Sequence, residues 1–164
     1  MAASPSPLLT GFPLIMRDDA RLLIMGSFPG EASLAAQQYY AHPRNQFWRL
    51  LSGVLGDDLA SLDYDARLDK LARHRIGLWD VIIACERQGS LDSSIRRPQL
   101  ADFSVLHGGF PDLDTIAFNG KTSGRFAPQF AAAGFRTVVL PSSSPANAQL
   151  SFDEKLVQWR TLLT

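Results

Sequence analysis

Cysteine is nearly absent from this sequence: Cys85 is the one such residue among 164. A single cysteine excludes an internal disulfide framework and a multi-cysteine metal or iron–sulfur site. We expect Cys85 to be a small buried residue beside a strand, not a nucleophile. The chain also starts without a basic region followed by an apolar stretch, so we expect no secretory signal and a cytoplasmic location.

Net charge is absent as well, because 16 Lys and Arg residues balance 16 Asp and Glu residues. This balance argues against a polybasic nucleic-acid binder, whose affinity comes from counterion release. It allows an enzyme that grips a short stretch of nucleic acid through a local patch. Lysine is scarce, with 3 residues against 13 arginines, which favours bidentate phosphate contacts. No apolar run approaches the roughly 18 residues of a membrane span, so we expect no membrane association.

Metal-ligand and nucleotide-binding motifs are missing too. The three histidines, His42, His74 and His107, are scattered, and no H-E-x-x-H motif occurs. The first glycine-rich turn lacks the G-x-G-x-x-G spacing of dinucleotide-binding folds. The Gly-Lys-Thr segment at residues 120–122 lacks the glycine five residues earlier that a P-loop requires, since that position is Thr115. We therefore expect neither a metal nor a cofactor.

Four short apolar runs alternate with segments of helical pattern. The runs cover residues 22–25, 76–83, 115–118 and 137–140. This alternation predicts a single domain over residues 1–164, a three-layer α/β/α sandwich with a central, mainly parallel four-stranded sheet. Right-handed crossovers would bring the carboxyl ends of the four strands to one edge. Residues 1–20 are expected to be a loose tail followed by a segment that covers the sheet.

Apolar spacing predicts the helices. Residues 47–55 carry a stripe at i, i+3, i+4, i+7 and i+8, and Gly56 ends it. Further helices are expected over residues 31–38, 64–74 and 121–133. A last helix opens with a capping box, Ser151 and Glu154. Its expected buried face consists of Phe152, Leu156, Trp159 and Leu163. Residues 86–101 are polar and read as a long irregular loop, a kind of segment that is often functional.

The first apolar run ends abruptly in a turn of sequence Gly-Ser-Phe-Pro-Gly at residues 26–30. Glycine permits close approaches that other residues resist, and proline fixes the backbone. A rigid turn at the carboxyl end of a strand is where open α/β sheets place their ligands. This turn is therefore the first candidate for a functional site.

The strand-end loops together resemble the motifs of the uracil-DNA glycosylase superfamily. The segments that carry the resemblance are Gly-Ser-Phe-Pro-Gly at 26–30, Tyr-Tyr-Ala-His-Pro-Arg-Asn-Gln-Phe-Trp at 39–48, Ala-Phe-Asn-Gly-Lys at 117–121 and Leu-Pro-Ser-Ser-Ser-Pro-Ala-Asn at 140–147. Their form is close to the mismatch-specific uracil/thymine branch. Taken at full length, the same segments resemble the hypoxanthine-DNA (deoxyinosine) glycosylases, often counted as the sixth family. This resemblance runs from about residue 22 to residue 163.

The resemblance implies a cofactor-free enzyme whose partner is DNA with a damaged or deaminated base. Such an enzyme hydrolyses the N-glycosidic bond of a flipped base, here hypoxanthine, and leaves an abasic site. Phe28 stands where the mismatch branch carries a catalytic Asn, and phenylalanine cannot orient or deprotonate water. The sixth family is understood to rely instead on the Asn of its His-Pro-x-Asn segment, which is Asn45 here.

The same alignment implies roles for further residues. Tyr40 matches a stacking aromatic, Asn119 is a candidate reader of the base edge, and Gly26, Ser27 and Phe28 would form the pocket wall. The insertion loop that holds the opened duplex would comprise Ser142, Ser143, Ser144, Pro145, Ala146 and Asn147. His42 and Asp80 are possible supporting residues; Asp80 could supply a carboxylate, although a loop-anchoring hydrogen bond is the favoured interpretation.

Two alternatives stay open. One is a mismatch-specific uracil/thymine glycosylase. The other, from a different class, is a non-catalytic module that binds damaged DNA, motivated by the loss of a polar group at Phe28. None of the three lysines lies in a matched catalytic motif, so a Schiff-base lyase step is not expected. The protein is expected to be a monomer.

Overall fold

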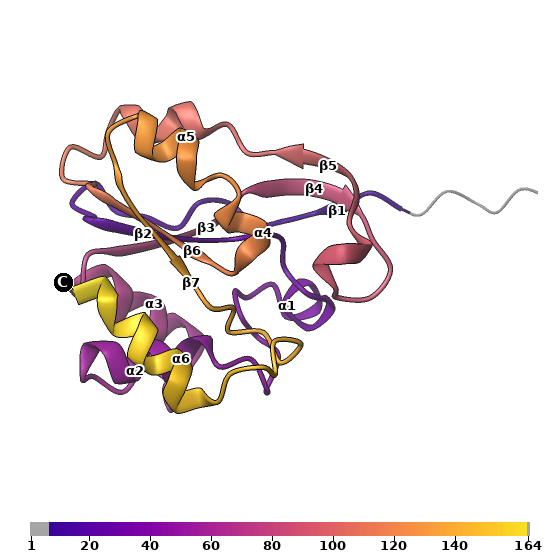
Figure 1. The fold of residues 1–164 in the computed structure, drawn as a ribbon, viewed down its shortest axis with the longest axis horizontal. Coiled ribbons are helices and arrows are strands. Elements are labelled where there is room, and N and C mark those ends of the chain that lie inside the picture. The colour runs from indigo at the N-terminus through magenta and orange to yellow at the C-terminus, as the bar shows by residue number, and fades with distance from the viewer. Residues whose placement is uncertain (1–6, 164) are drawn as a thin grey trace, which may run out of the picture.

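A parallel sheet forms the centre of the computed structural model, which describes residues 7–163 (Figure 1). Within these residues its strand order is β3-β2-β6-β7, and all neighbouring strands are parallel. The strands span Leu22–Gly26 (β2), Ile76–Asp80 (β3), Thr115–Asn119 (β6) and Arg136–Leu140 (β7). Because all four run the same way, their carboxyl ends meet at one edge, as the sequence predicted.

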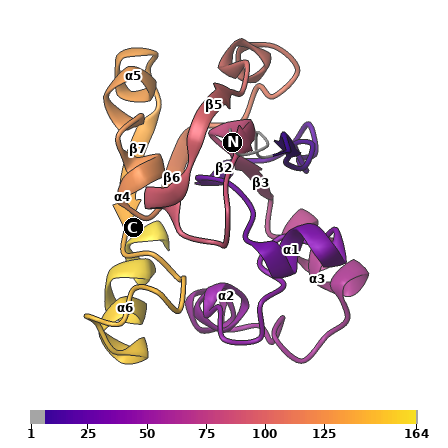
Figure 2. The ribbon, with the colours of Figure 1, turned by 90° about the vertical axis from the view of Figure 1, so that its right-hand side faces the viewer.

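Three helices cover one face of this sheet, as Figures 1 and 2 show from two directions. They are α2 (Phe47–Leu55), α3 (Tyr64–Arg73) and α6 (Phe152–Trp159). The predicted stripe of α2 is buried at Phe47, Leu50, Leu51 and Val54, and Gly56 ends the helix in the left-handed region with φ of 62°. The apolar period alone was therefore enough to place this helix correctly.

The opposite face is covered by α4 (Lys121–Gly124), α5 (Ala127–Ala132) and the 3-10 helix η2 (Phe103–His107). Phe130 packs against Phe118 of the sheet and Phe103 of η2, at ring-centroid distances of 5.5 and 4.9 Å. The expected helix over residues 121–133 is thus two short helices separated by Arg125 and Phe126, and Pro128 lies in the first turn of the second. With layers on both faces of the sheet, the predicted α/β sandwich is confirmed.

The expected single strand over residues 76–83 is wrong. β3 ends at Asp80, and a separate strand, β4 (Ile82–Glu86), joins an antiparallel sheet of order β1-β4-β5. The reason is that β2, the parallel partner of β3, ends at Gly26 directly opposite Asp80. Beyond that point the chain must pair elsewhere. Cys85 lies in β4 and is buried, as expected.

The expected irregular loop over residues 86–101 is also wrong in part. It contains the 3-10 helix η1 (Asp92–Ser94) and the edge strand β5 (Arg96–Leu100), which pairs with β4. All five residues of β5 are exposed, so no apolar alternation marked it as a strand. Pro98 suits this edge strand, because proline has no backbone N–H to donate to a neighbouring strand and is tolerated where that position faces solvent.

The chain before β2 runs along both sheets. β1 (Leu9–Thr10) pairs with β4, and Ile15 forms an isolated bridge with Leu78. Phe12 between them is buried in the core. Residues 9–15 thus contact both sheets, whereas the expected tail at residues 1–6 lies outside the described residues. The short helix expected over residues 31–38 is α1 (Glu31–Ala36).

The last helix begins as predicted and ends differently. Ser151 and Glu154 form the reciprocal hydrogen bonds of a capping box. After Trp159 the chain tightens into the 3-10 helix η3 (Arg160–Leu163). Because the spacing changes to three residues per turn, Leu162 enters the core and Leu163 is 64% exposed. The expected burial of Leu163 was therefore wrong.

This difference between two neighbouring leucines can be measured. We expect Leu162→Ala to lower the free energy of unfolding by about 2 kcal/mol or more, as buried Leu→Ala changes do. Leu163→Ala should change it by less than about 0.5 kcal/mol, since the side chain is exposed. Urea denaturation of both variants checks this, and an equal loss in both would contradict the described end of the chain.

Candidate functional site: a pocket at the strand ends

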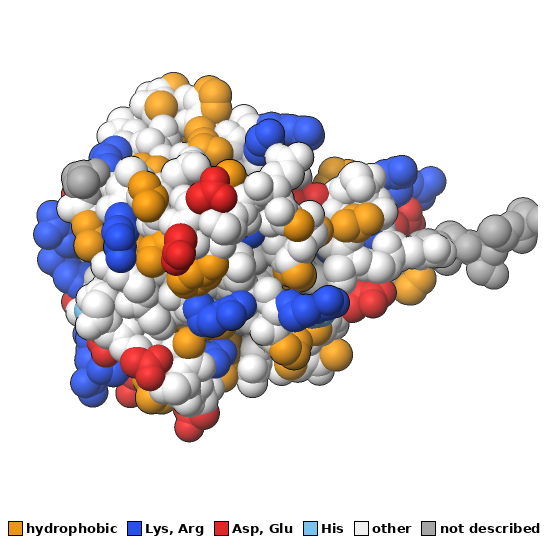
Figure 3. All heavy atoms as spheres, turned by 60° about the horizontal axis from the view of Figure 1, so that its bottom comes forward, with side chains coloured by type: hydrophobic (Ala, Val, Ile, Leu, Met, Phe, Trp, Pro, Cys, Tyr) orange, Lys and Arg blue, Asp and Glu red, His pale blue; other side chains and the backbone are white. Residues whose placement is uncertain are grey.

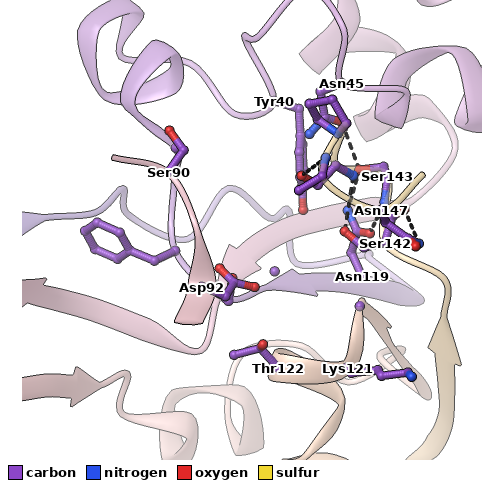
Figure 4. Close-up of a pocket in the computed structure, with 18 of the residues that line it drawn as sticks. Tyr40, Asn45, Ser90, Asp92, Asn119, Lys121, Thr122, Ser142, Ser143 and Asn147 are labelled. Atoms are coloured by element: carbon purple, nitrogen blue, oxygen red, sulfur yellow. Dashed lines mark hydrogen bonds between the residues drawn. The ribbon is translucent and has the colours of Figure 1, made fainter. Parts of the chain in front are cut away.

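A cavity of about 760 Å³ opens at the carboxyl edge of the parallel sheet (Figure 4). Its lining comes from the loops that follow β2, β6 and β7, the segment before α2, and η1. It includes every site residue expected from the sequence: Gly26, Ser27, Phe28, Tyr40, His42, Asn45, Asp80, Asn119, Ser142, Ser143, Ser144, Pro145, Ala146 and Asn147. Residues from positions 26 to 147 are thus brought to one site.

A hydrogen-bond chain connects three of these loops through Ser143, which is 1% exposed. Asn119 Nδ2 donates to Ser143 Oγ at 2.9 Å, and the Ser143 backbone N–H donates back to Asn119 Oδ1 at 2.9 Å. Ser143 Oγ in turn donates to Asn45 Oδ1 at 2.8 Å, as Figure 4 shows. Asn119 therefore holds the loop after β7, the candidate insertion loop, through a contact that the sequence did not predict.

The same hydrogen bonds determine which amide atoms of Asn45 remain free to contact a ligand. Its Oδ1 accepts from Ser143 and from the Phe47 backbone N–H at 2.9 Å, so both lone pairs are used. A backbone N–H can only donate, which fixes the orientation of the amide. Among residues 7–163, neither Nδ2 proton of Asn45 has an acceptor. Asn45 precedes the N-cap, Gln46, and presents a donor to the pocket.

Aromatic rings form two parts of the wall. Tyr40 stacks on buried Phe47 with ring centroids 3.9 Å apart and an interplanar angle of 13°. Its backbone has a positive φ of 56°, a conformation that favours glycine and is uncommon for tyrosine. Phe28 is 6% exposed, and the Arg87 guanidinium lies 5.2 Å from its ring centroid. Both rings are held by packing behind them.

Asp80 and the Tyr40 hydroxyl meet beside Gly26. A Cβ atom at Gly26 would lie 2.6 Å from Asp80 Oδ1 and 3.0 Å from the Tyr40 hydroxyl oxygen, so only glycine fits. Asp80 is 5% exposed, yet neither its Oδ2 nor the Tyr40 hydroxyl has a hydrogen-bond partner among the described residues. The favoured interpretation of Asp80 as a loop anchor is therefore wrong.

Burial shifts the titration of both groups. It raises the pKa of Asp80 to about 7, and the nearby Asp92 carboxylate adds to this shift. Burial also raises the pKa of the Tyr40 phenol, with a further contribution from Asp80. The Asn119 side chain, which lies near the phenol without a hydrogen bond of good geometry, opposes that shift. A carboxyl group with this pKa is substantially protonated at neutral pH.

Sequence reasoning missed the contribution of η1 to the pocket. Ser27 Oγ donates to Asp92 Oδ1 at 2.7 Å, and Ser90 Oγ accepts from the Glu31 backbone N–H at 2.9 Å. Lys121, at the start of α4, also lines the cavity. The length and polarity of residues 86–101 were the one available signal, and they did not single out Asp92.

The insertion-loop candidate is braced from within. The Ser144 backbone N–H donates to Ser142 Oγ at 3.1 Å, and Asn147 Nδ2 donates to the Ser142 carbonyl at 3.2 Å. Pro145 and Ala146, at the tip, are exposed. A loop of this kind holds its shape while its apolar tip faces solvent.

Charge on the molecular surface is mixed. Figure 3 shows groups of Lys and Arg side chains near the middle of the displayed face, with Asp and Glu side chains between and around them. This distribution fits the zero net charge. It is a pattern of local basic groups, not a uniformly positive face.

Comparison with known proteins identifies the family. The model of the uracil DNA glycosylase superfamily matches residues 13–163. The chain belongs to the uracil DNA glycosylase superfamily.

Among residues 7–163, no helix is long and apolar enough to cross a membrane, and no group of three or more His, Cys, Asp or Glu residues could hold a metal ion.

Proteins from the genus Methanosarcina are similar to this chain over most of its length. The hypoxanthine DNA glycosylase of Methanosarcina barkeri (strain Fusaro / DSM 804) is 45% identical over 137 residues, which are 84% of this chain and 87% of that protein. The protein of the same name from Methanosarcina acetivorans is 43% identical over 86% of this chain and 89% of its own length. A solution NMR structure from M. acetivorans, named as a uracil DNA glycosylase, superposes with a TM-score of 0.84 at 40% identity and covers 96% of this chain and 100% of that one.

The raised pKa of Asp80 leads to a prediction about stability. An unfolded Asp titrates near pH 3.9, and Asp80 in the folded protein titrates at about 7. Between these values the folded state binds more protons, so stability falls as pH rises from about 4 to about 7 and stays lower above. We expect Asp80→Asn, which cannot ionise, to be more stable than the parent protein by roughly 1–4 kcal/mol at pH 8 and by much less at pH 4.

Urea denaturation at both pH values measures this difference. Asp69→Asn is the matched control, because Asp69 is exposed on α3 and lies outside the pocket. If Asp80→Asn were destabilising at pH 8, the carboxylate would have a stabilising partner and the described environment of Asp80 would be wrong.

Proposed function

We propose that this protein is a monofunctional DNA glycosylase that hydrolyses hypoxanthine from deoxyinosine in DNA and leaves an abasic site. The observation that supports it most is Asn45: it lines the pocket, Ser143 and Phe47 hold its amide oxygen, and its amide donors have no acceptor among the described residues. The names of the two Methanosarcina relatives support the same substrate. Phe28, in place of a polar residue, disfavours uracil excision by the usual route.

Base flipping would place the target base against Tyr40. Stacking contributes about 1–3 kcal/mol per base, and Phe47 behind the ring keeps Tyr40 in position. The exposed tip at Pro145 and Ala146 would enter the space that the base leaves in the duplex. Flipping costs least for a mispaired base such as hypoxanthine, which adds selectivity before chemistry begins.

Bond cleavage would then proceed with little need for a strong base. Loss of the base builds positive charge on the sugar and negative charge on the departing base, and preorganised dipoles can stabilise this separation of charge. Asn45 Nδ2 donates to the oxygen of the attacking water or to a sugar oxygen; it cannot accept a proton, because its Oδ1 is already paired. Its role in this proposal is to position, not to deprotonate.

Activity on a panel of oligonucleotides tests this function. Duplexes with one inosine, uracil or xanthine are incubated with enzyme in excess and then treated with alkali. We expect cleavage at inosine. Clean cleavage at uracil without cleavage at inosine would favour a mismatch uracil/thymine glycosylase, and tight inosine binding without base release would favour a binding module.

Two additions sharpen the panel. Asn45→Ala should lower the single-turnover rate by about 100-fold or more, the usual effect of losing a preorganised donor, whereas Gln129→Ala on the exposed side of α5 should leave it unchanged. Because Lys121 lines the pocket, borohydride trapping is included. A covalent complex with DNA would contradict a monofunctional enzyme.

A further inference from the structure

Asp80 is the one carboxyl group of the pocket that burial shields from solvent, and the proposed mechanism has not used it. It ends β3 directly opposite Gly26, lines the cavity and is 5% exposed. Its Oδ2 is buried without a hydrogen-bond partner among the described residues, and the Tyr40 hydroxyl beside it is in the same condition. Buried polar groups without partners are uncommon and call for an explanation.

We infer that Asp80, in its neutral form, donates its proton to the departing purine base, with the Tyr40 hydroxyl as a second contact to the polar edge of that base. This inference rests on the proposed function, since it needs a flipped hypoxanthine in the pocket. Binding of the base would give the Asp80 carboxyl group and the Tyr40 hydroxyl the hydrogen-bond partners that they lack among the described residues.

Burial and a neighbouring carboxylate keep Asp80 neutral. From the segment after α1, the Tyr39 and Tyr40 phenols also face Asp80, but burial raises the pKa of both phenols, so they carry no charge near pH 7. From η1, the Asp92 carboxylate repels its negative form. Burial and this like charge act in the same direction, and they raise the pKa of Asp80 to about 7. A general acid works best with a pKa near the working pH.

Proton transfer from Asp80 accompanies cleavage of the glycosidic bond. The bond between C1′ and N9 breaks, and its electron pair goes to the purine ring. Asp80 gives its proton to an acceptor atom of that ring system, so hypoxanthine leaves neutral and Asp80 becomes a carboxylate. Water forms the new bond to C1′ and releases a proton, which restores the Asp80 carboxyl group through solvent.

Gly26 explains why the carboxyl group can reach this place. Any side chain there would meet Asp80 Oδ1 at 2.6 Å. The glycine therefore leaves room for an acid and a phenol on the pocket floor. A purely structural carboxyl group would be expected to hold a backbone N–H or a cation, and Asp80 holds neither among the described residues.

The test measures the single-turnover rate of hypoxanthine release from an inosine duplex between pH 5 and pH 9. With the parent protein we expect a rate that falls above about pH 7, as the acid is lost. Asp80→Asn keeps a donor and an acceptor in place but cannot transfer a proton. We expect its rate at pH 6 to be lower than that of the parent by about 100-fold or more. The rate should not fall further above pH 7, and the DNA affinity should stay within about threefold of the parent.

Two further variants serve as controls for this measurement. Asp69→Asn on α3 should keep the parent rate and pH profile. Tyr40→Phe retains the stack on Phe47 but removes the hydroxyl, so it should be slower while the fall above pH 7 remains. If Asp80→Asn kept the parent rate and pH profile, or if it lost only DNA affinity, the inference would be overturned. A parent protein that releases no hypoxanthine at any pH would instead overturn the proposed function.

Discussion

The hydrogen bond from Ser143 to Asn45 is the contact on which the arrangement of the pocket depends. Ser143 follows β7, Asn45 precedes α2, and Asn119, which also bonds to Ser143, ends β6. The Gln46 backbone N–H donates to the Ser143 carbonyl at 3.0 Å and strengthens the same junction. Since buried bonds of this kind are costly to leave unmade, the three loops hold one another in a single geometry.

A buried lysine extends this junction into the helical layer. Lys155 of α6 is 2% exposed and donates to Gln46 Oε1 at 2.9 Å, while the Trp159 indole donates to the Pro141 carbonyl at 3.0 Å. Burial lowers the pKa of Lys155. The helix that packs under the sheet thus also fixes the loop ends that carry the proposed catalytic amide and the proposed insertion loop.

Two electrostatic environments lie within one cavity. Asn45 is a neutral amide whose acceptor is used up by its neighbours, so it offers donors only. Asp80 is more buried than Asn45, its Oδ2 has no partner among the described residues, and burial favours its neutral form. In the proposed enzyme the first group acts on the sugar side and the second on the base side. Phe28, packed under Arg87, adds an apolar ring to the wall of the same cavity.

Local pattern in the sequence was sufficient for much of this fold. The stripe of α2 and its stop at Gly56, the capping box at Ser151 and the four parallel strands follow from periodicity and turn chemistry, which act between residues close in the chain. Motif order was sufficient to gather the pocket residues, because parallel strands bring their carboxyl ends to one edge.

Tertiary structure alone decided the rest. The split of residues 76–83 into β3 and β4 depends on where a neighbouring strand ends, and β5 is a strand only because β4 lies beside it. The Ser143 bridge and the unpartnered state of Asp80 depend on groups that come from distant parts of the chain. The sequence determined which residues reach the pocket; hydrogen-bond pairing and desolvation, which exist only after packing, decided what each of them can do there.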